Sequence, residues 1–129
     1  MSTQEWHRKA MQSSHGDERA WLFAQRDDEP IGLVHGRRRR PATLLLFSMW
    51  VDPRARRSGI GSQLIVSLEA WAARWGARET VLWVLRDNER ALRFYGHLGF
   101  HAVEAGRDAE AGATFGAVAL CRDIGSASD

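Results

Sequence analysis

The chain has 129 residues, of which 44% are hydrophobic and 26% charged, and its formal net charge is +2. This size and balance predict a single globular domain over residues 1–129, with a core that needs neither disulfides nor metal ions. So small a charge does not indicate a nucleic-acid partner, and no apolar run is long enough to span a bilayer. Because Cys121 is the only cysteine and the polar N-terminus is no signal peptide, we expect a reducing, cytoplasmic setting.

The first part of the chain predicts a short helix and then three antiparallel strands. Residues 4–13 have the pattern of an amphipathic helix. Residues 20–25 and 31–36 predict a hairpin around a polar turn. The arginine-rich segment 37–41 is interpreted as a solvated turn before the nearly apolar run Thr43–Val51 (TLLLFSMWV). Such a run is typical of a central strand that is covered on both faces.

A helix and a further strand follow. From Gly59 onwards apolar residues recur at spacings of three and four, which indicates an amphipathic helix. Gly76 ends this pattern, at the position where helices prefer glycine. Residues 80–85 (TVLWVL) then predict a second buried strand.

The last part of the chain predicts a helix and two closing strands. Asn88 is suited to cap the N-terminus of a helix that ends at Gly99. Residues 100–104 and 114–122 predict an antiparallel pair. The expected fold class is therefore α/β, a mixed sheet with helices on both faces.

The turn after Thr43–Val51 has the properties of an anion site. Residues 56–61 (RRSGIG) open directly onto the helix, whose first N–H groups have no internal partner and carry partial positive charge. Glycines at 59 and 61 leave room for a ligand to approach those N–H groups. The adjacent arginines add full charge. Together these features predict a cradle for a pyrophosphate.

Two signatures connect the chain to a known family. Residues 56–61 match R-x-x-G-x-G and follow a strand that ends in V-x-P at residues 51–53. Residues 88–100 match N-x-x-A-x-x-F-Y-x-x-L-G-F. In this order and on these elements, the chain resembles the GNAT superfamily of N-acetyltransferases over about residues 20–122. A dinucleotide-binding fold is excluded, because no βαβ unit carries a complete G-x-G-x-x-G with an acid after it.

The resemblance implies a mostly antiparallel sheet whose central strands, Thr43–Val51 and 80–85, splay apart to form a slot for acetyl-CoA. Asn88 would lie at the mouth of this slot, and Tyr95 would face the thioester sulfur. Other residues would hold the pantetheine arm and the pyrophosphate through their backbone groups. They are Met49, Trp50 and Val51 for the pantetheine, and Arg56, Arg57, Ser58, Gly59, Ile60, Gly61 and Ser62 for the pyrophosphate.

The family's reaction transfers the acetyl group directly to an amine, here of a small molecule or a peptide. Tyr95 would act as general acid toward the leaving thiolate, since its hydroxyl is protonated at neutral pH, although a packed tyrosine is the alternative. Backbone amides near Trp50 and Val51 would stabilise the oxyanion. The central strand contains no acid, so His35, a chain of waters and bulk solvent all remain candidates for the general base.

Two histidines, the cysteine and the side chains of two tryptophans lie outside these assigned roles. His97 and His101 lack a third ligand, so we expect no metal site. Cys121 is expected to be a buried small hydrophobe. Trp50 and Trp83 either line the acceptor slot or belong to the core.

The short N-terminus departs from the family pattern. Relatives begin with a strand and two helices, whereas about nineteen residues precede the first predicted strand here. The acceptor pocket would then be open or completed by another subunit, which leaves a homodimer open. We expect acetyl-CoA and an amine as the partners, with neither nucleic acid nor membrane. The alternative function is an acyl-CoA-binding module that has lost catalysis.

Overall fold

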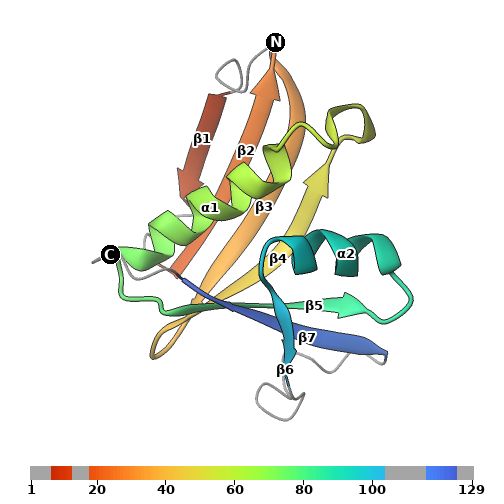
Figure 1. Ribbon diagram of the computed structural model, residues 1–129. Helices are drawn as coiled ribbons and strands as arrows, with labels where there is room; N and C mark the ends of the chain where they lie inside the picture. Colours follow the sequence, from red (N-terminus) through yellow and green to blue (C-terminus); the bar gives the residue numbers. More distant parts are fainter. Residues whose placement is uncertain (1–6, 13–17, 104–115, 125–129) are drawn as a thin grey trace.

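The strands form one mixed, seven-stranded sheet in the order β1-β2-β3-β4-β5-β7-β6 (Figure 1). The computed structural model describes residues 7–12, 18–103 and 116–124. Neighbouring strands are antiparallel except for the parallel pair β4 and β5. The strands are β1 (His7–Gln12), β2 (Arg19–Arg26), β3 (Glu29–Arg39), β4 (Thr43–Val51), β5 (Glu79–Leu85), β6 (His101–Val103) and β7 (Ala117–Asp123). The predicted mixed and mostly antiparallel sheet is confirmed.

Two α-helices connect the strands at the predicted places. The 3₁₀-helix η3 (Pro53–Ala55) precedes α1 (Ile60–Ala73), and Gly59 is the N-cap of α1. The second helix, α2 (Glu89–His97), is capped by Asn88, whose Oδ1 accepts a hydrogen bond from the Ala91 amide at 3.2 Å. Neither helix, within the part of the chain that is described, combines the length and apolar character needed to cross a bilayer.

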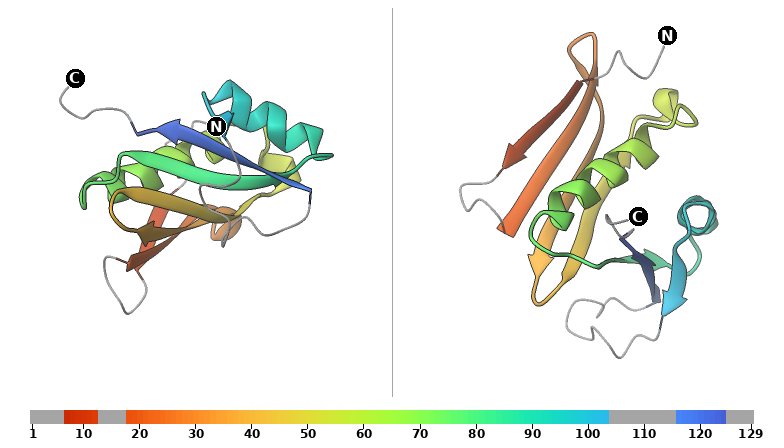
Figure 2. Two further views of the ribbon diagram at one scale, coloured as in Figure 1. Left: turned by 90° about the horizontal axis from the view of Figure 1, so that it is seen from below. Right: turned by 60° about the vertical axis from the view of Figure 1, so that its left-hand side comes forward.

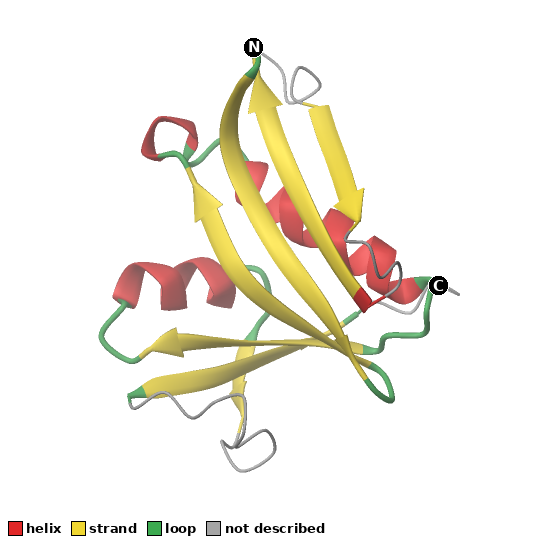
Figure 3. Cartoon of the chain, turned by 180° about the vertical axis from the view of Figure 1, so that it is seen from behind, coloured by secondary structure: helices red, strands yellow, loops and turns green. Residues whose placement is uncertain are grey.

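Both helices lie on the same face of the sheet (Figures 1 and 3). The helix α1 packs against β2, β3 and β4, and one continuous core cluster joins its residues Leu64 and Leu68 to Tyr95 of α2. Among the described residues the opposite face has no helix and carries a small cluster around Leu45, Val81 and Cys121, so it is called the uncovered face below. The prediction of helices on both faces is thus not met by the described residues. The connections from β4 to β5 and from β5 to β6 each link parallel strands and advance across the sheet in the same direction. Because such connections are right-handed, they place both helices on one face of the sheet.

Two further predictions are corrected. Residues 7–12 form strand β1 and not a helix, since they pair along β2 from His7 opposite Gln25 to Gln12 opposite Ala20. An isolated helix of ten residues is marginal in water, whereas β2 offers a complete row of backbone partners. Residues 4–6 and 13 lie outside the described residues.

The second correction concerns the arginine-rich segment 37–41, which was predicted to be a turn. Strand β3 continues to Arg39, and only residues 40–42 form the turn. Arg38 lies on the helix-covered face, where its guanidinium carbon is 4.8 Å from the centre of the Trp75 ring. A cation held over an aromatic ring is stabilised there, which explains why the strand tolerates arginine at this position.

The closing strands β6 and β7 confirm the predicted antiparallel pair, with His101 opposite Cys121. The predicted ends at residues 104, 114 and 115 fall outside the described residues. Within β4, only Leu44, Leu45 and Leu46 are fully buried, so the expected cover on both faces holds for the first half of the strand alone.

Candidate functional site

The sheet opens between its two central strands. The parallel strands β4 and β5 pair only through Thr43–Glu79, Leu44–Thr80 and Leu45–Val81, and beyond these residues they diverge. The views in Figure 2 show the group β5, β7 and β6 turning away from β1 to β4. The predicted splayed pair is confirmed, and the opening in the backbone pairing between the carboxyl-terminal halves of β4 and β5 is called the slot below.

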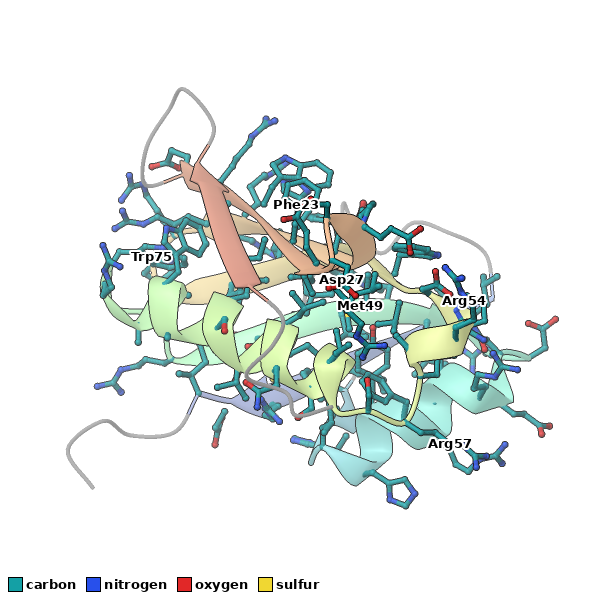
Figure 4. The ribbon with its side chains drawn as sticks, turned by 90° about the horizontal axis from the view of Figure 1, so that it is seen from above. Phe23, Asp27, Met49, Arg54, Arg57 and Trp75 are labelled. Carbon is teal, nitrogen blue, oxygen red and sulfur yellow. The ribbon has the colours of Figure 1, made fainter. Side chains whose placement is uncertain are left out.

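A β-bulge lies in β4 beside this slot. Leu33 faces Trp50 and His35 faces Phe47, so β4 uses one residue more than β3 over the same interval. Ser48 has a φ of 54°, in the left-handed region. Such bulges redirect the side chains that follow them. Here Met49 is turned to the helix side, where it lies between sheet and α1 (Figure 4), next to Gly61. Sequence reasoning missed this bulge.

The turn between β4 and α1 exposes consecutive backbone amides. Arg57 and Gly59 have φ angles of 69° and 86°, and the first helical hydrogen bond runs from the Gln63 amide to the Gly59 carbonyl at 3.0 Å. The amides of residues 57–62 have no backbone acceptor within the described chain. Left-handed residues beside a helix N-terminus form a concave anion site. The Arg56 amide, by contrast, donates to the Pro53 carbonyl at 3.4 Å. The series of amides without a backbone acceptor therefore begins at Arg57, one residue later than predicted.

The arginines of this turn differ in their availability. Arg54 is occupied, because its guanidinium lies 3.0 Å from the Asp52 carboxylate and 3.8 Å from that of Glu29. Hydrogen bonds from Arg54 hold the pKa of Asp52 below its ordinary value. Arg56 and Arg57 are exposed and have no ion pair with any residue that the structure describes. Figure 4 shows Arg57 projecting from the turn, apart from Arg54. Two cations, Arg56 and Arg57, therefore flank the row of amides without an ion pair among the described residues.

Tyr95 lies on α2, which packs directly on the first turn of α1. A Cβ atom built on Gly61 would lie 3.0 Å from Cζ of Phe94 and 3.1 Å from Cε of Met49. The ring of Tyr95 is only 7% exposed and meets the rings of Phe94 and Phe100 at centroid distances of 5.0 and 5.5 Å. Burial raises the pKa of Tyr95 to about 12. The hydroxyl is therefore protonated throughout the neutral range.

The remaining predicted residues lie around the slot. Asn88 follows the end of β5, and its amide donates to the Leu85 carbonyl at 3.0 Å while its side chain caps α2. Trp50 is 41% exposed near the end of β4, and Val51 packs against the main core. Trp83 is half-buried and packs with the small cluster on the uncovered face.

A family model described as the acetyltransferase (GNAT) family matches residues 2–100. The chain belongs to the GNAT family. It is similar to an uncharacterized N-acetyltransferase of Methanocaldococcus jannaschii, with 31% identity over 96 residues, which cover 68% of this chain and 42% of the relative. The resemblance stated from the two signatures is thereby confirmed, since both lie within the matched residues.

Solved structures show the same GNAT fold. The PaiA N-acetyltransferase of Thermoplasma acidophilum, in complex with coenzyme A, superposes with a TM-score of 0.71 at 20% identity, over 82% of this chain and 61% of that one. A GNAT-family acetyltransferase of Staphylococcus aureus gives a TM-score of 0.76 at 17% identity, over 86% and 71%. The chain thus spans less than two thirds of the M. jannaschii and T. acidophilum proteins.

A buried polar network that the sequence analysis did not identify holds α2 in the GNAT fold. Glu69 of α1 accepts hydrogen bonds from Thr80 at 2.6 Å and from Arg122 at 2.5 Å, and Arg122 also donates to the Leu98 carbonyl at 2.6 Å. These bonds connect α1, β5 and β7 to the end of α2, the helix that carries Tyr95. The sequence did contain a signal for this network, because Glu69 lies one helical turn after Ile65 and so on the apolar side of α1, where an acid needs a buried partner.

The histidines and the cysteine occupy different surroundings. His97 and His101 are exposed, and no three His, Cys, Asp or Glu side chains gather as a metal site in the described ranges 7–12, 18–103 and 116–124. Cys121 is buried on the uncovered face, where its thiol lies 3.4 Å from a Glu79 oxygen.

His35 lies on the uncovered face of this GNAT sheet. Its ring stacks on Trp21 with centroids 4.2 Å apart, and its Nε2 is buried without a hydrogen-bond partner among the described residues. Burial first, and then the charges of Arg19 and Arg37, lower the pKa of His35 below its ordinary value. The imidazole is therefore neutral at pH 7.

This lowered pKa predicts a loss of stability in acid. The unfolded chain takes up the His35 proton near the ordinary pKa of about 6.5, while the folded chain does so only at lower pH. The unfolded state thus binds more protons in this window, and the free energy of unfolding falls as the pH falls through it. His35→Phe keeps a flat ring on Trp21 and removes the proton. Urea midpoints at pH 7.5 and 5.5 should show a smaller acid loss in the variant; an equal loss in both proteins would contradict this assignment.

Proposed function

We propose that this chain transfers the acetyl group of acetyl-CoA directly to an amine of a small molecule or peptide, within a ternary complex. The observation that carries the proposal is the row of amides at residues 57–62, which have no backbone acceptor in the described part of the chain and lie just beyond the end of β4. Such a row at a helix N-terminus suits a pyrophosphate, and the slot suits a thin, extended arm. Membership of the GNAT family supports the same reaction.

Each part of the site receives a role under this proposal. The amides of residues 57–62, with Arg56 and Arg57, hold the pyrophosphate, and backbone groups of Met49, Trp50 and Val51 pair with the pantetheine arm. A solved protein of the same fold with coenzyme A bound supports a coenzyme A site on this chain. Asn88 borders the mouth of the slot.

The chemistry needs a neutral amine, which attacks the thioester carbonyl and forms a C–N bond while the C–S bond breaks. Tyr95 is the general acid, and its hydroxyl donates to the sulfur as negative charge develops there. Burial keeps that hydroxyl protonated, since the pKa of Tyr95 is raised to about 12. Because β4 contains no acid, the amine loses its proton to His35 or to solvent.

The second candidate function is an acyl-CoA-binding module without catalysis, favoured by the absence of an acid on β4. Thiol release from acetyl-CoA, followed with a disulfide reagent over a panel of amines, decides between the two. Turnover with at least one amine is expected. Tight acetyl-CoA binding without any turnover would favour the binding module, and an absence of acetyl-CoA binding would contradict both.

A further inference from the structure

We propose that the acceptor is an amine carrying an acidic group, a carboxylate or a phosphate, which Arg19 and Arg37 bind on the uncovered face of the sheet. The inference rests on the proposed acetyl transfer and specifies its second substrate. It follows from the register of β2, β3 and β4, which arranges the outward side chains in rows across the three strands.

The first of these rows is aromatic and leads to the slot. Trp21 lies opposite His35, and His35 lies opposite Phe47. The Trp21 and His35 rings are stacked with 12° between their planes, and the Phe47 ring is 5.9 Å from that of His35. The row offers an aromatic surface, with the Phe47 ring tilted by 34° from that of His35, on which an organic body can lie.

This row ends at the slot. Phe47 comes two residues after Leu45, the last residue of β4 that pairs with β5. Trp83 comes two residues after Val81, the last paired residue of β5, and both aromatic side chains pack with the same cluster. Phe47 and Trp83 therefore stand on the two diverging walls, and a ligand on the row reaches the slot with one end.

The next row begins with two arginines. Arg19 and Arg37 are direct cross-strand partners, and like charges in that position destabilise a sheet. Both are exposed, and neither forms an ion pair with a residue of the described chain. The guanidinium carbon of Arg37 is 5.9 Å from the centre of the Phe47 ring, so this cation is held over the aromatic row. An acidic group between the two guanidinium groups would relieve their repulsion and accept forked hydrogen bonds.

The charge of this surface also excludes a class of acceptors. Residues 19–23, 33–39 and 43–47 contain no acid and four arginines, of which Arg38 lies on the helix-covered face. The acid Glu79 of β5 is half-buried and accepts a hydrogen bond from the Thr43 hydroxyl at 2.9 Å. A polyamine or another polycation would therefore meet repulsion from Arg19 and Arg37 on the surface that leads to the slot.

Matched acceptors test the proposal. Tyrosine is compared with tyramine for the carboxylate, O-phosphoethanolamine with ethanolamine for the phosphate, and spermidine serves as the polycation. Thiol release should give the acidic member of at least one pair a kcat/KM at least tenfold higher than its neutral counterpart. The two pairs identify which acid is preferred. Spermidine should be the poorest substrate.

Arginine variants locate the effect. Arg19→Gln and Arg37→Gln should each reduce the preference for the acidic amine about tenfold, mainly through KM, with acetyl-CoA affinity unchanged. Arg74→Gln removes an exposed arginine at the end of α1, on the helix-covered face, and should leave the preference intact. Equal rates within both pairs, preference for spermidine, or an unchanged preference in both Arg19→Gln and Arg37→Gln would overturn the proposal.

A binding measurement keeps the test independent of turnover. Calorimetric titration of the same amines into protein saturated with desulfo-CoA should show tighter binding of an acidic amine, weakened about tenfold by Arg37→Gln and by added salt. Acidic amines that bind in this way without turnover would support the acceptor surface and contradict the proposed transfer. Absence of any such binding would contradict the acceptor surface, even if other amines were acetylated.

Discussion

Replacing Tyr95 with phenylalanine should lower kcat for acetyl transfer roughly ten- to a thousandfold and leave the affinity for acetyl-CoA nearly unchanged. The substitution removes only the hydroxyl, while the ring contacts to Phe94 and Phe100, at 5.0 and 5.5 Å, can persist. Without the hydroxyl the thiolate has no proton donor as it leaves, which raises the barrier to breaking the C–S bond. Steady-state rates over the amine panel, with calorimetric titration of acetyl-CoA, measure both quantities.

The ionisation of Tyr95 can be measured separately in the wild-type protein. Tyr95 is the only tyrosine, so tyrosinate absorbance reports its ionisation directly. We expect no rise in this absorbance between pH 9 and 10.5, because burial raises the pKa to about 12. Unchanged kcat in a folded Tyr95→Phe protein would exclude Tyr95 as the general acid and leave it a packing residue.

Gly59→Ala should lower the affinity for acetyl-CoA at least tenfold, about 1.4 kcal/mol. Gly59 has a φ of 86°, and a Cβ there meets nothing within 4 Å. The methyl group itself therefore fits, but the left-handed backbone costs an alanine about 1 kcal/mol. Relief of this strain rotates the neighbouring amides away from a common point. Calorimetric titration with acetyl-CoA and with desulfo-CoA measures the loss.

The same helix supplies the matched control. Gly76, beyond the other end of α1, has a φ of 94° and also has nothing within 4 Å of a built Cβ. Gly76→Ala should lose similar stability and no affinity. Equal affinity in Gly59→Ala and wild type would place the pyrophosphate elsewhere.

Gly61 is less suitable for this test than the sequence suggests. From the sequence alone, Gly61→Val should change stability only modestly, as a substitution at a helix end. The structure places Gly61 against Phe94 and Met49, at 3.0 and 3.1 Å from a built Cβ. Valine would overpack this contact, at a cost of about 1–3 kcal/mol. A loss of affinity in Gly61→Val would then combine two causes.

The elements with strong local signals were predictable. The apolar run of β4, the Gly59 and Gly76 limits around α1, and the Asn88 cap of α2 all follow from short-range rules of periodicity and capping. Strand β1 was not predictable in this way, because its six residues carry a helical pattern and become a strand only through pairing with β2. Long-range pairing of this kind leaves no trace in a local window.

The same distinction between local and long-range signals applies to the residues of the site. The glycine turn and Tyr95 were found because their residues are close in sequence and match two signatures. The Arg19–Arg37 pair, the Trp21–His35 stack and the Glu69–Arg122 ion pair join residues that are 14 or more positions apart. Register and burial bring them together, and a single sequence specifies neither.

The opening between β4 and β5 has a consequence for how the protein behaves in storage. Beyond Leu45 and Val81 each strand presents an edge inside the sheet, with no neighbouring strand on that side. Unpaired edges are templates on which a strand of another molecule can add, the step that starts edge-to-edge aggregation. Most proteins protect only the outer edges of a sheet, whereas this one has two inner edges as well. A ligand bound in the slot would block the addition of another strand at these inner edges. The ligand-free protein should therefore aggregate more readily than the ligand-bound protein.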